Sequence, residues 1–321
     1  MAAIEAEALH RTYKTHTGTL RRKTKEIEAV RGVSFAIEPG ELFGLLGPNG
    51  AGKTTTIKML ITLLIPTAGS ARVLGMDVVE RAHEVRKRIG YVFGGERGVY
   101  ERLSGYDNLR YFAELYGVPA NEQRRRIEEL LEIVGLKGRE HERAEGYSRG
   151  MKQRLHVARG LLHDPDVIFL DEPTIGLDPV GARDVRATIA ALTEAGKTVL
   201  LTTHYMFEAD ALCDRIAVIS QGRIVAEGTP TELKRGVAEG AVVEVEVFGA
   251  AEATVERVRA LGGVTSVAIE ERDQAQVLVV QTGQGVELTQ AILGCLDGAD
   301  VGRISQREPT LEDAYVALVT E

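Results

Sequence analysis

Short apolar runs alternate with amphipathic segments over residues 1–235. The runs "VIFL", "TVLLTT" and "ELFGLLG" are nearly continuous, which is typical of parallel strands buried on both faces. In "NEQRRRIEELLEIVGL" and "MKQRLHVARGLL" the apolar residues recur three and four positions apart, so each predicts an amphipathic helix. "GVSFAI" and "RIGYVF" add strands, and "KTTTIKMLITLL" adds a helix. We therefore predict an α/β domain over residues 1–235 with a helical subdomain at about residues 97–163.

Residues 236–321 follow a different pattern. "VEVEVF" alternates strictly between apolar and acidic residues, and a helical run after it places four apolar residues on one face: Ala251, Val255, Val258 and Leu261. "VTSVAIEE", "AQVLVVQT", a second helix and "GRISQ" complete the order strand, helix, strand, strand, helix, strand. This order predicts a small ferredoxin-like α+β domain, closed by a helix at "TLEDAYVALV".

Charge separates the same two regions. Residues 236–321 hold 15 acidic and five basic residues, a net charge of −10, whereas residues 1–235 carry +2. This acidic balance argues against a nucleic-acid partner, which requires a basic face. We interpret the basic clusters "RRKTK" (residues 21–25) and "RRR" (residues 124–126) as a solvated loop and a helix surface.

Neither a membrane span nor a secretory segment is predicted. No apolar run reaches the roughly 18–20 residues that cross a bilayer, and no signal segment opens the chain. Cys213 and Cys295 form no CxxC pair, so the sequence supports neither a disulfide framework nor a zinc cluster. We expect a soluble protein inside the cell that contacts membranes only through a partner.

The stretch "GPNGAGKT", residues 47–54, matches the phosphate-binding pattern G-x-x-x-x-G-K-[ST] and has the required strand before it and helix after it. Its glycines let backbone N–H groups curl around phosphates, its lysine reaches the β- and γ-phosphates, and its threonine hydroxyl can ligate Mg²⁺. The predicted nucleotide-binding residues here are Gly47, Pro48, Asn49, Gly50, Ala51, Gly52, Lys53, Thr54 and Thr55.

Two carboxylates end the apolar run in "VIFLDEP". We predict that Asp171 holds Mg²⁺ together with Thr54, and that Glu172 polarises the attacking water. His204 ends "TVLLTTH" in the same way. It could reach a γ-phosphate or be an ordinary structural histidine, and the residues alone leave both interpretations open.

The stretch "GYSRGMKQR" places a Ser-Arg-Gly turn directly before a helix. Helix starts bind anions because their first N–H groups are unpaired and the helix dipole is positive there. An ordinary N-cap serine is the alternative interpretation.

These motifs, in this order along about residues 8–230, resemble the nucleotide-binding subunit of an ABC transporter. The resemblance implies that Ser148, Arg149 and Gly150 form the signature that caps the γ-phosphate bound to the opposite subunit. It also implies a nucleotide contact from Asp178, which lies in "GLD", and adenine stacking by Tyr13, which lies in "RTYKT". The cofactors that it implies are ATP and Mg²⁺.

The partners that the resemblance implies are a second copy, or another ATPase subunit, and a separate transmembrane permease that holds the chain at the cytoplasmic face. The tail, with "PTLEDAYVAL", resembles the C-terminal domain of drug-resistance exporter ATPases of the ABC-2 class. An alternative is a non-transport ABC ATPase that acts on ribosomes or DNA, but such chains usually carry two such domains or a long coiled coil. A regulator without turnover is disfavoured by Glu172 and His204.

The sequence departs from the family pattern at two places. In the signature, Tyr147, Arg149 and Met151 replace the usual residues, while Ser148 and Gly150 remain. The glutamine expected after "IGYVF" is missing: Gly94 or Gly95 occupies its place. The nearest polar side chain is Glu96, which we consider either a partial substitute or an exposed surface acid.

Overall fold

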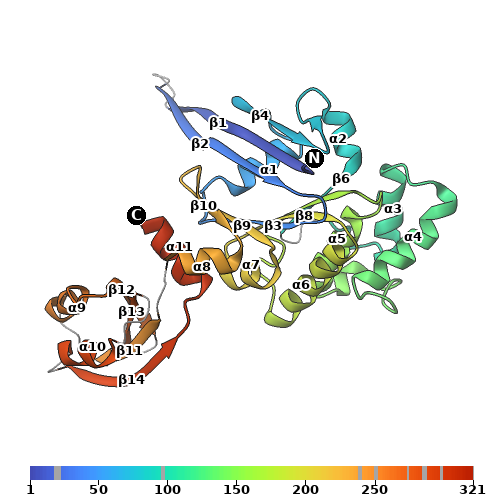
Figure 1. The fold of residues 1–321 in the computed structure, drawn as a ribbon. Helices are drawn as coiled ribbons and strands as arrows, with labels where there is room; N and C mark the ends of the chain where they lie inside the picture. Colours follow the sequence, from blue (N-terminus) through green and yellow to red (C-terminus); the bar gives the residue numbers. More distant parts are fainter. Residues whose placement is uncertain are drawn as a thin grey trace. The chain divides into compact units, whose positions relative to one another are not determined.

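The computed structural model describes two compact units, Met1–Glu227 and Gly228–Glu321 (Figure 1). The described residues are 1–17, 23–94, 98–237, 241–248, 252–272, 275–283, 288–296 and 299–320. The boundary lies before helix α8 (Pro230–Val237), whereas the change in charge suggested residue 235. The difference arises because α8 packs against helix α11 (Leu311–Thr320), the last helix of the second unit.

A six-stranded sheet forms the centre of the first unit, in the order β10-β9-β3-β8-β7-β6. Strand β3 pairs in parallel with β8 and β9, and β7 pairs in parallel with β6 and β8. The strands are β3 (Leu42–Leu46), β6 (Ile89–Phe93), β7 (Val167–Asp171), β8 (Thr198–Thr203), β9 (Arg215–Ser220) and β10 (Arg223–Gly228). Every residue of β3, β7 and β8 is buried, as their continuous apolar runs predict.

A second, four-stranded sheet has the order β2-β1-β4-β5, which the sequence did not predict. Its strands are β1 (Ile4–Thr17), β2 (Lys23–Ile37), β4 (Ala68–Val73) and β5 (Met76–Asp77). The antiparallel pairing of β1 with β2 continues to Thr17 opposite Lys23. The interpretation of residues 21–25 as a loop is therefore wrong for Lys23 and Lys25, because cross-strand pairing carries the strand through them.

The described part of the first unit also contains seven α-helices, of which α3 and α4 lie to one side of the sheets (Figure 1). They are α1 (Lys53–Leu60), α2 (Ala82–Arg88), α3 (Gly105–Leu115), α4 (Ala120–Ile133), α5 (Arg149–Gly160), α6 (Pro179–Glu194) and α7 (Met206–Leu212). Helix α1 ends earlier than its apolar pattern predicts, because Thr62 adopts φ +67° and turns the chain out of the helix. No helix in the described residues is long and apolar enough to cross a membrane.

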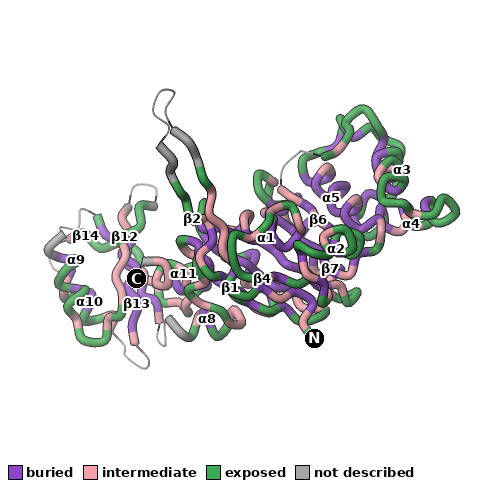
Figure 2. Tube along the Cα trace, turned by 90° about the horizontal axis from the view of Figure 1, so that it is seen from above, coloured by how far each residue is buried: buried purple, intermediate pink, exposed green. Residues whose placement is uncertain are grey.

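The core of the first unit lies between its two sheets and the helices that flank them, where the chain is mostly buried (Figure 2). Phe35 of β2 stacks on Phe43 of β3 with ring centroids 5.4 Å apart, so the two sheets share one core. This packing supports the carboxyl ends of β3, β7 and β8, where the predicted chemistry lies.

The second unit has the sheet order β12-β13-β11-β14, with the described pairs antiparallel. This is the order of a ferredoxin-like fold, so the predicted α+β class is confirmed. Its remaining elements are β11 (Val242–Phe248), α9 (Glu252–Arg259), β12 (Val264–Arg272), β13 (Ala275–Thr282), α10 (Thr289–Cys295) and β14 (Asp300–Arg307). Val255, Val258 and Ile292 of α9 and α10 join the valines of β11 in one buried cluster.

Candidate active site

The loop between β3 and α1 requires glycine at several positions. A Cβ atom on Gly47 would lie 2.3 Å from the Ile219 carbonyl oxygen, and one on Gly52 would lie 2.6 Å from that of Ala29. Gly50 and Gly52 also adopt left-handed φ values of +83° and +113°. Helix α1 then starts at Lys53 without a side-chain cap, so its first N–H groups remain available for an anion.

Lys53 is 5% exposed and lies at the centre of a polar cluster. Its Nζ donates to the carbonyl oxygen of Gly47 at 2.5 Å and lies 3.0 Å from Glu172 Oε1. The loop thus holds a buried cation that already faces a carboxylate from the neighbouring part of the sheet.

Asp171, at the end of β7, accepts two hydroxyl hydrogen bonds on the same oxygen. Thr54 Oγ1 donates to Asp171 Oδ1 at 3.2 Å, and Thr202 Oγ1 donates to it at 2.6 Å. The hydroxyl of Thr54 and the carboxylate of Asp171 are hard oxygen ligands of the kind that Mg²⁺ prefers, so the residues fit this metal. Thr202 was not among the predicted site residues; the two threonines that end "TVLLTT" mark a polar strand end but do not indicate the bond to Asp171.

Glu172 is the next residue and has a strained backbone, with φ +53°. Its N–H group donates to the carbonyl oxygen of Thr202 at 3.0 Å and lies 3.1 Å from the Oγ1 atom of the same residue. Glu172 Oε2 lies 2.6 Å from His204 Nδ1. The structure therefore brings Lys53, Glu172 and His204 together, at the carboxyl ends of three neighbouring parallel strands.

The predicted signature residues belong to a second cluster, where α5 and α6 begin. Ser148 is the N-cap of α5, and its Oγ accepts from Met151 N at 3.2 Å. Arg149 is the first residue of α5 and Asp178 is the N-cap of α6. Gly150 lies so close to Gly181 of α6 that a Cβ atom would lie 3.0 Å from the Gly181 Cα.

Tyr13 lies on β1 opposite Ile27, in the antiparallel sheet. The guanidinium of Arg11 lies 5.0 Å from the centroid of its ring, so the ring is already engaged by a cation. Tyr13 thus belongs to the four-stranded sheet, whereas Lys53 and Glu172 follow strands of the six-stranded sheet.

The segment after β6 lacks room for the missing glutamine at its first position. Gly94 N donates to the carbonyl oxygen of Asp171 at 2.7 Å, and a Cβ atom on Gly94 would lie 2.1 Å from the carbonyl oxygen of Glu172. A side chain at position 94 would therefore displace the segment that carries Asp171 and Glu172. Gly95 and Glu96 lie outside the described residues.

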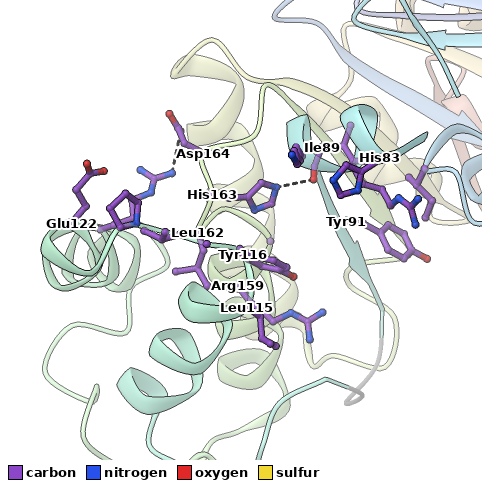
Figure 3. A pocket seen from close by; sticks show the side chains of 18 of the residues that line it. His83, Ile89, Tyr91, Leu115, Tyr116, Glu122, Arg159, Leu162, His163 and Asp164 are labelled. Atoms are coloured by element: carbon purple, nitrogen blue, oxygen red, sulfur yellow. Dashed lines mark hydrogen bonds and ion pairs between the residues drawn. The ribbon is translucent and has the colours of Figure 1, made fainter. Parts of the chain in front are cut away.

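A cavity of about 1020 Å³ lies between α2, β6 and the helices α3, α4 and α5 (Figure 3). His163 Nε2 contacts the carbonyl oxygen of Ile89 at 2.9 Å, and the rings of His163 and Tyr116 lie 4.8 Å apart. Leu115 is 61% exposed at the cavity edge. Burial, together with the charge of Asp171, raises the pKa of Tyr91 in this wall to about 12.

A P-loop nucleoside triphosphatase is defined by a strand, a glycine-rich loop and a helix that begins at a buried lysine, with two carboxylates at the end of another parallel strand of the same sheet. Residues 30–175 match the ABC transporter family. A fluoroquinolones export ATP-binding protein of Mycobacterium tuberculosis is 49% identical over 207 residues, which cover 64% of this chain and 67% of that protein. The daunorubicin resistance ATP-binding protein DrrA3 of Streptomyces coeruleorubidus is 38% identical over 293 residues, 91% of each chain.

Among solved structures, a dimeric post-hydrolysis state of an ATP-binding cassette with ADP and Pi aligns with a TM-score of 0.61 and 26% identity. That alignment covers 70% of this chain and 98% of the other. The chain belongs to the ABC transporter family, as an ATP-binding subunit with ATPase activity. The export and resistance relatives favour a transport ATPase over a non-transport ATPase acting on ribosomes or DNA, and the post-hydrolysis state of the structural neighbour disfavours a regulator without turnover.

Proposed function

We propose that two copies of this chain enclose two ATP molecules, hydrolyse them, and thereby drive a separate permease in the export direction. The observation that carries the proposal is the cluster of Lys53, Glu172 and His204 beside the phosphate loop. A buried cation, a carboxylate and an imidazole converge there on the point where the γ-phosphate of a bound nucleotide would lie.

The residues of the first cluster divide the work of hydrolysis. Backbone N–H groups of residues 49–55 and the Lys53 ammonium bind the phosphates, whose oxygens replace the present contacts of Lys53 with Gly47 and Glu172. Thr54 and Asp171 hold Mg²⁺, which supplies charge neutralisation when it is bound. Tyr13 stacks on the adenine ring.

Glu172 accepts a proton as water attacks the γ-phosphorus. The bond from that phosphorus to the oxygen shared with the β-phosphate breaks, and ADP leaves with this oxygen. His204, in contact with Glu172 Oε2, orients the carboxylate and faces the γ-phosphate. The release of Lys53 from Glu172 by the arriving phosphate frees the carboxylate for this role.

A second copy completes each site. The start of α5, with Ser148 and Gly150, lies against the start of α6, where Asp178 is the N-cap, and Arg149 is the first residue of α5. Exposed apolar side chains border this region and suit a partner surface: Ile175, Val180, Tyr205 and Phe207. We infer that the helix start of one copy caps the γ-phosphate held by the other.

The permease binds in the cavity between α2, β6 and the helical subdomain. Its wall combines apolar side chains such as Leu115 with arginines, so it suits an amphipathic helix (Figure 3). Strand β6 connects the cavity to the proposed hydrolytic site, because β6 lines the cavity and Gly94 at its end donates to the carbonyl oxygen of Asp171. Binding there keeps the chain at the cytoplasmic face of the membrane.

The export direction is supported by the relatives, whose names describe export and drug resistance. The relative DrrA3 matches 91% of this chain, so the likeness extends beyond the ATPase unit into the second one. We propose that this second unit acts in dimer contact or regulation.

A mixed dimer tests the shared site. One copy carries Lys53→Ala and the other Ser148→Arg, whose side chain would block the approach of the helix start. Each homodimer has two damaged sites, whereas the mixed dimer joins one intact phosphate loop to one intact signature. Differently tagged, co-purified mixed dimers should regain up to about half of the wild-type turnover if the sites act independently. The comparison is with wild-type dimers that carry the same two tags.

A mixed dimer with no more activity than either homodimer, beside active tagged wild-type dimers, contradicts a site shared between two copies. The matched control is a mixed dimer in which one chain carries both Lys53→Ala and Ser148→Arg and the other chain is wild type. In that dimer each site carries one lesion, so turnover should stay low although half of the chains are intact.

A further inference from the structure

Glu208, in the first turn of α7, is a buried carboxyl group outside the catalytic cluster. It is 1% exposed, and its Oε2 accepts a hydrogen bond from Thr174 Oγ1 at 3.2 Å. Its Oε1 is also buried and has no hydrogen-bond partner among the described residues. A carboxyl group in such a place is costly, because burial penalises its charge and leaves an acceptor unsatisfied.

The hydrogen bond to Thr174 joins two segments that each begin at a residue of the active site. Thr174 lies in the turn after Glu172, where Ile175 N donates to the Glu172 carbonyl oxygen at 3.2 Å. Glu208 lies four positions after His204, and Glu208 N donates to the carbonyl oxygen of Tyr205 at 3.1 Å. The two segments are thus linked twice, by the contact between Glu172 and His204 and by the hydrogen bond between Thr174 and Glu208.

The turn that contains Thr174 needs such support. Glu172 adopts φ +53°, a conformation that costs about 1–3 kcal/mol in a residue other than glycine and persists only when its surroundings hold it. The hydrogen bonds of its N–H group to Thr202 hold it from the strand side. On the other side, Thr174 is bound to the helix that follows His204.

The surroundings of Glu208 favour the uncharged acid. Burial raises its pKa, and the charge of Glu172 acts in the same direction, while the hydroxyls of Thr203 and Thr174 and the charge of Arg186 oppose this shift in part. The neutral form brings no second negative charge next to Glu172. Glutamine reproduces the shape of this side chain, carries no charge, and keeps an oxygen that can accept from the Thr174 hydroxyl.

We propose that Glu208 is a positioning residue for ATP hydrolysis, which ties the turn after Glu172 to the helix after His204 so that the two side chains face the same γ-phosphate. The inference rests on the proposed roles of Glu172 and His204. It assigns to Glu208 no contact with nucleotide or water. The predicted consequence of losing the bond is a misplaced Glu172 in a site that still binds ATP.

The test removes each end of the hydrogen bond separately. Thr174→Val and Glu208→Leu should each lower kcat about 10- to 100-fold, as expected for small displacements of a catalytic group, and leave KM for ATP unchanged. Glu208→Gln keeps an acceptor for the Thr174 hydroxyl and should retain most of the activity. The matched control is Thr188→Val, because Thr188 is equally buried on α6 but its hydroxyl bonds to Asp184 of the same helix.

The combined variant Thr174→Val/Glu208→Leu shows whether the two residues act as one link. Its kcat should be no lower than that of the poorer single variant, whereas independent roles would multiply the two losses. The hydrolysis rate is divided by the amount of protein that binds an ATP analogue. Misfolded protein therefore does not lower the kcat that is obtained. Multiplied losses, a change in KM alone, or a Glu208→Gln variant as slow as Glu208→Leu would overturn the proposal.

Glu172→Gln, measured beside these variants, separates this inference from the function on which it rests. If Glu172→Gln retains wild-type turnover, the proposed hydrolytic site is wrong whatever the Glu208 variants do. If Glu172→Gln is inactive while Thr174→Val and Glu208→Leu match the Thr188→Val control, the site stands and only the positioning role of Glu208 fails.

Discussion

Each unit of the chain contains a cluster of opposite charges that is partly withdrawn from water, but the two clusters are built differently. In the second unit, Arg307 donates to both carboxylate oxygens of Asp313, at 2.6 and 3.0 Å, and to Glu244 Oε1 at 3.0 Å. Asp313 also accepts from the N–H and the hydroxyl of Thr310. In the first unit, Lys53 instead bonds to a carbonyl of its own loop and faces Glu172.

The difference separates a cluster that closes on itself from one that awaits a ligand. The Arg307 fork and the Thr310 cap join β14, β11 and the start of α11, and they leave Asp313 only 8% exposed. The Lys53 cluster stands beside a strained Glu172 and uncapped helix N–H groups, which an anion would satisfy. A charge cluster closed by a forked arginine thus indicates structural support, whereas a buried lysine beside a strained carboxylate residue and uncapped helix N–H groups indicates chemistry.

The largest effect should come from Glu172→Gln, which removes the proposed proton acceptor but keeps the side-chain shape. We expect kcat to fall about 10²- to 10⁴-fold, with ATP binding retained. ATP-analogue binding and phosphate release measure the two quantities separately. Glu194→Gln, at the exposed end of α6, is the control and should behave as wild type.

Lys53→Ala should break the same cluster from the phosphate side. Loss of the ammonium should lower kcat/KM about 10²- to 10³-fold, because a preorganised charge is removed from the phosphates. Lys58→Ala is the matched control, since Lys58 lies exposed on the same helix. Steady-state phosphate release checks both variants, and equal rates for the two would remove Lys53 from the site.

Local sequence patterns predict parts of both units. The phosphate loop and the "VIFLDEP" strand were predictable because each motif is local: a few adjacent residues specify a strand, a turn and the chemistry. The elements of the second unit followed from strict alternation in "VEVEVF" and from regular helical spacing. Both patterns depend only on which neighbouring residues share a face.

Contacts between distant segments were not predictable. Nothing near Thr202 in the sequence indicates that its hydroxyl bonds to Asp171, and nothing near Glu208 indicates Thr174. Strand order in the antiparallel sheet of the first unit depends likewise on pairings such as Ile4 with Val73, which no local periodicity encodes. The sequence therefore predicts which residues carry the chemistry, whereas the contacts that hold these residues in place are visible only in the fold.

Arg307→Met should affect stability rather than turnover. Removing the guanidinium leaves the carboxylate of Asp313 mostly buried with only the Thr310 cap, which should cost the second unit about 2–3 kcal/mol. Urea unfolding of the full chain, followed by hydrogen exchange in β14 and α11, measures the loss. Arg303→Met is the control on the exposed face of β14, and an equal loss in both variants would contradict a saturated cluster.

The smallest effect concerns acid, where the two units should respond over different pH ranges. His156 of α5 is 1% exposed and contacts Arg159, and burial, with the Arg159 charge, lowers its pKa from 6.5 to about 3. Between these two pH values the unfolded chain binds a proton at His156 and the folded unit does not. The free energy of unfolding of the first unit therefore falls as the pH drops from about 6.5 toward 3. The pKa of Asp313 is also lowered, because the hydrogen bonds and charge of Arg307 and the Thr310 cap outweigh its burial. Its contribution is therefore lost only below the ordinary aspartate range, about pH 4.

His156→Phe isolates the histidine contribution, because phenylalanine fills the same space against Phe93, whose ring centroid lies 4.8 Å from the imidazole. Between pH 7 and pH 5 the wild-type first unit should lose about 2 kcal/mol more than the variant. Hydrogen exchange in α5 and in β14, followed in the same samples, assigns each loss to its unit. If the wild type loses more stability than the variant only below pH 4, as expected for a carboxylate, His156 is protonated in the folded chain. The burial of His156 is then not the reason why the two units respond differently to acid.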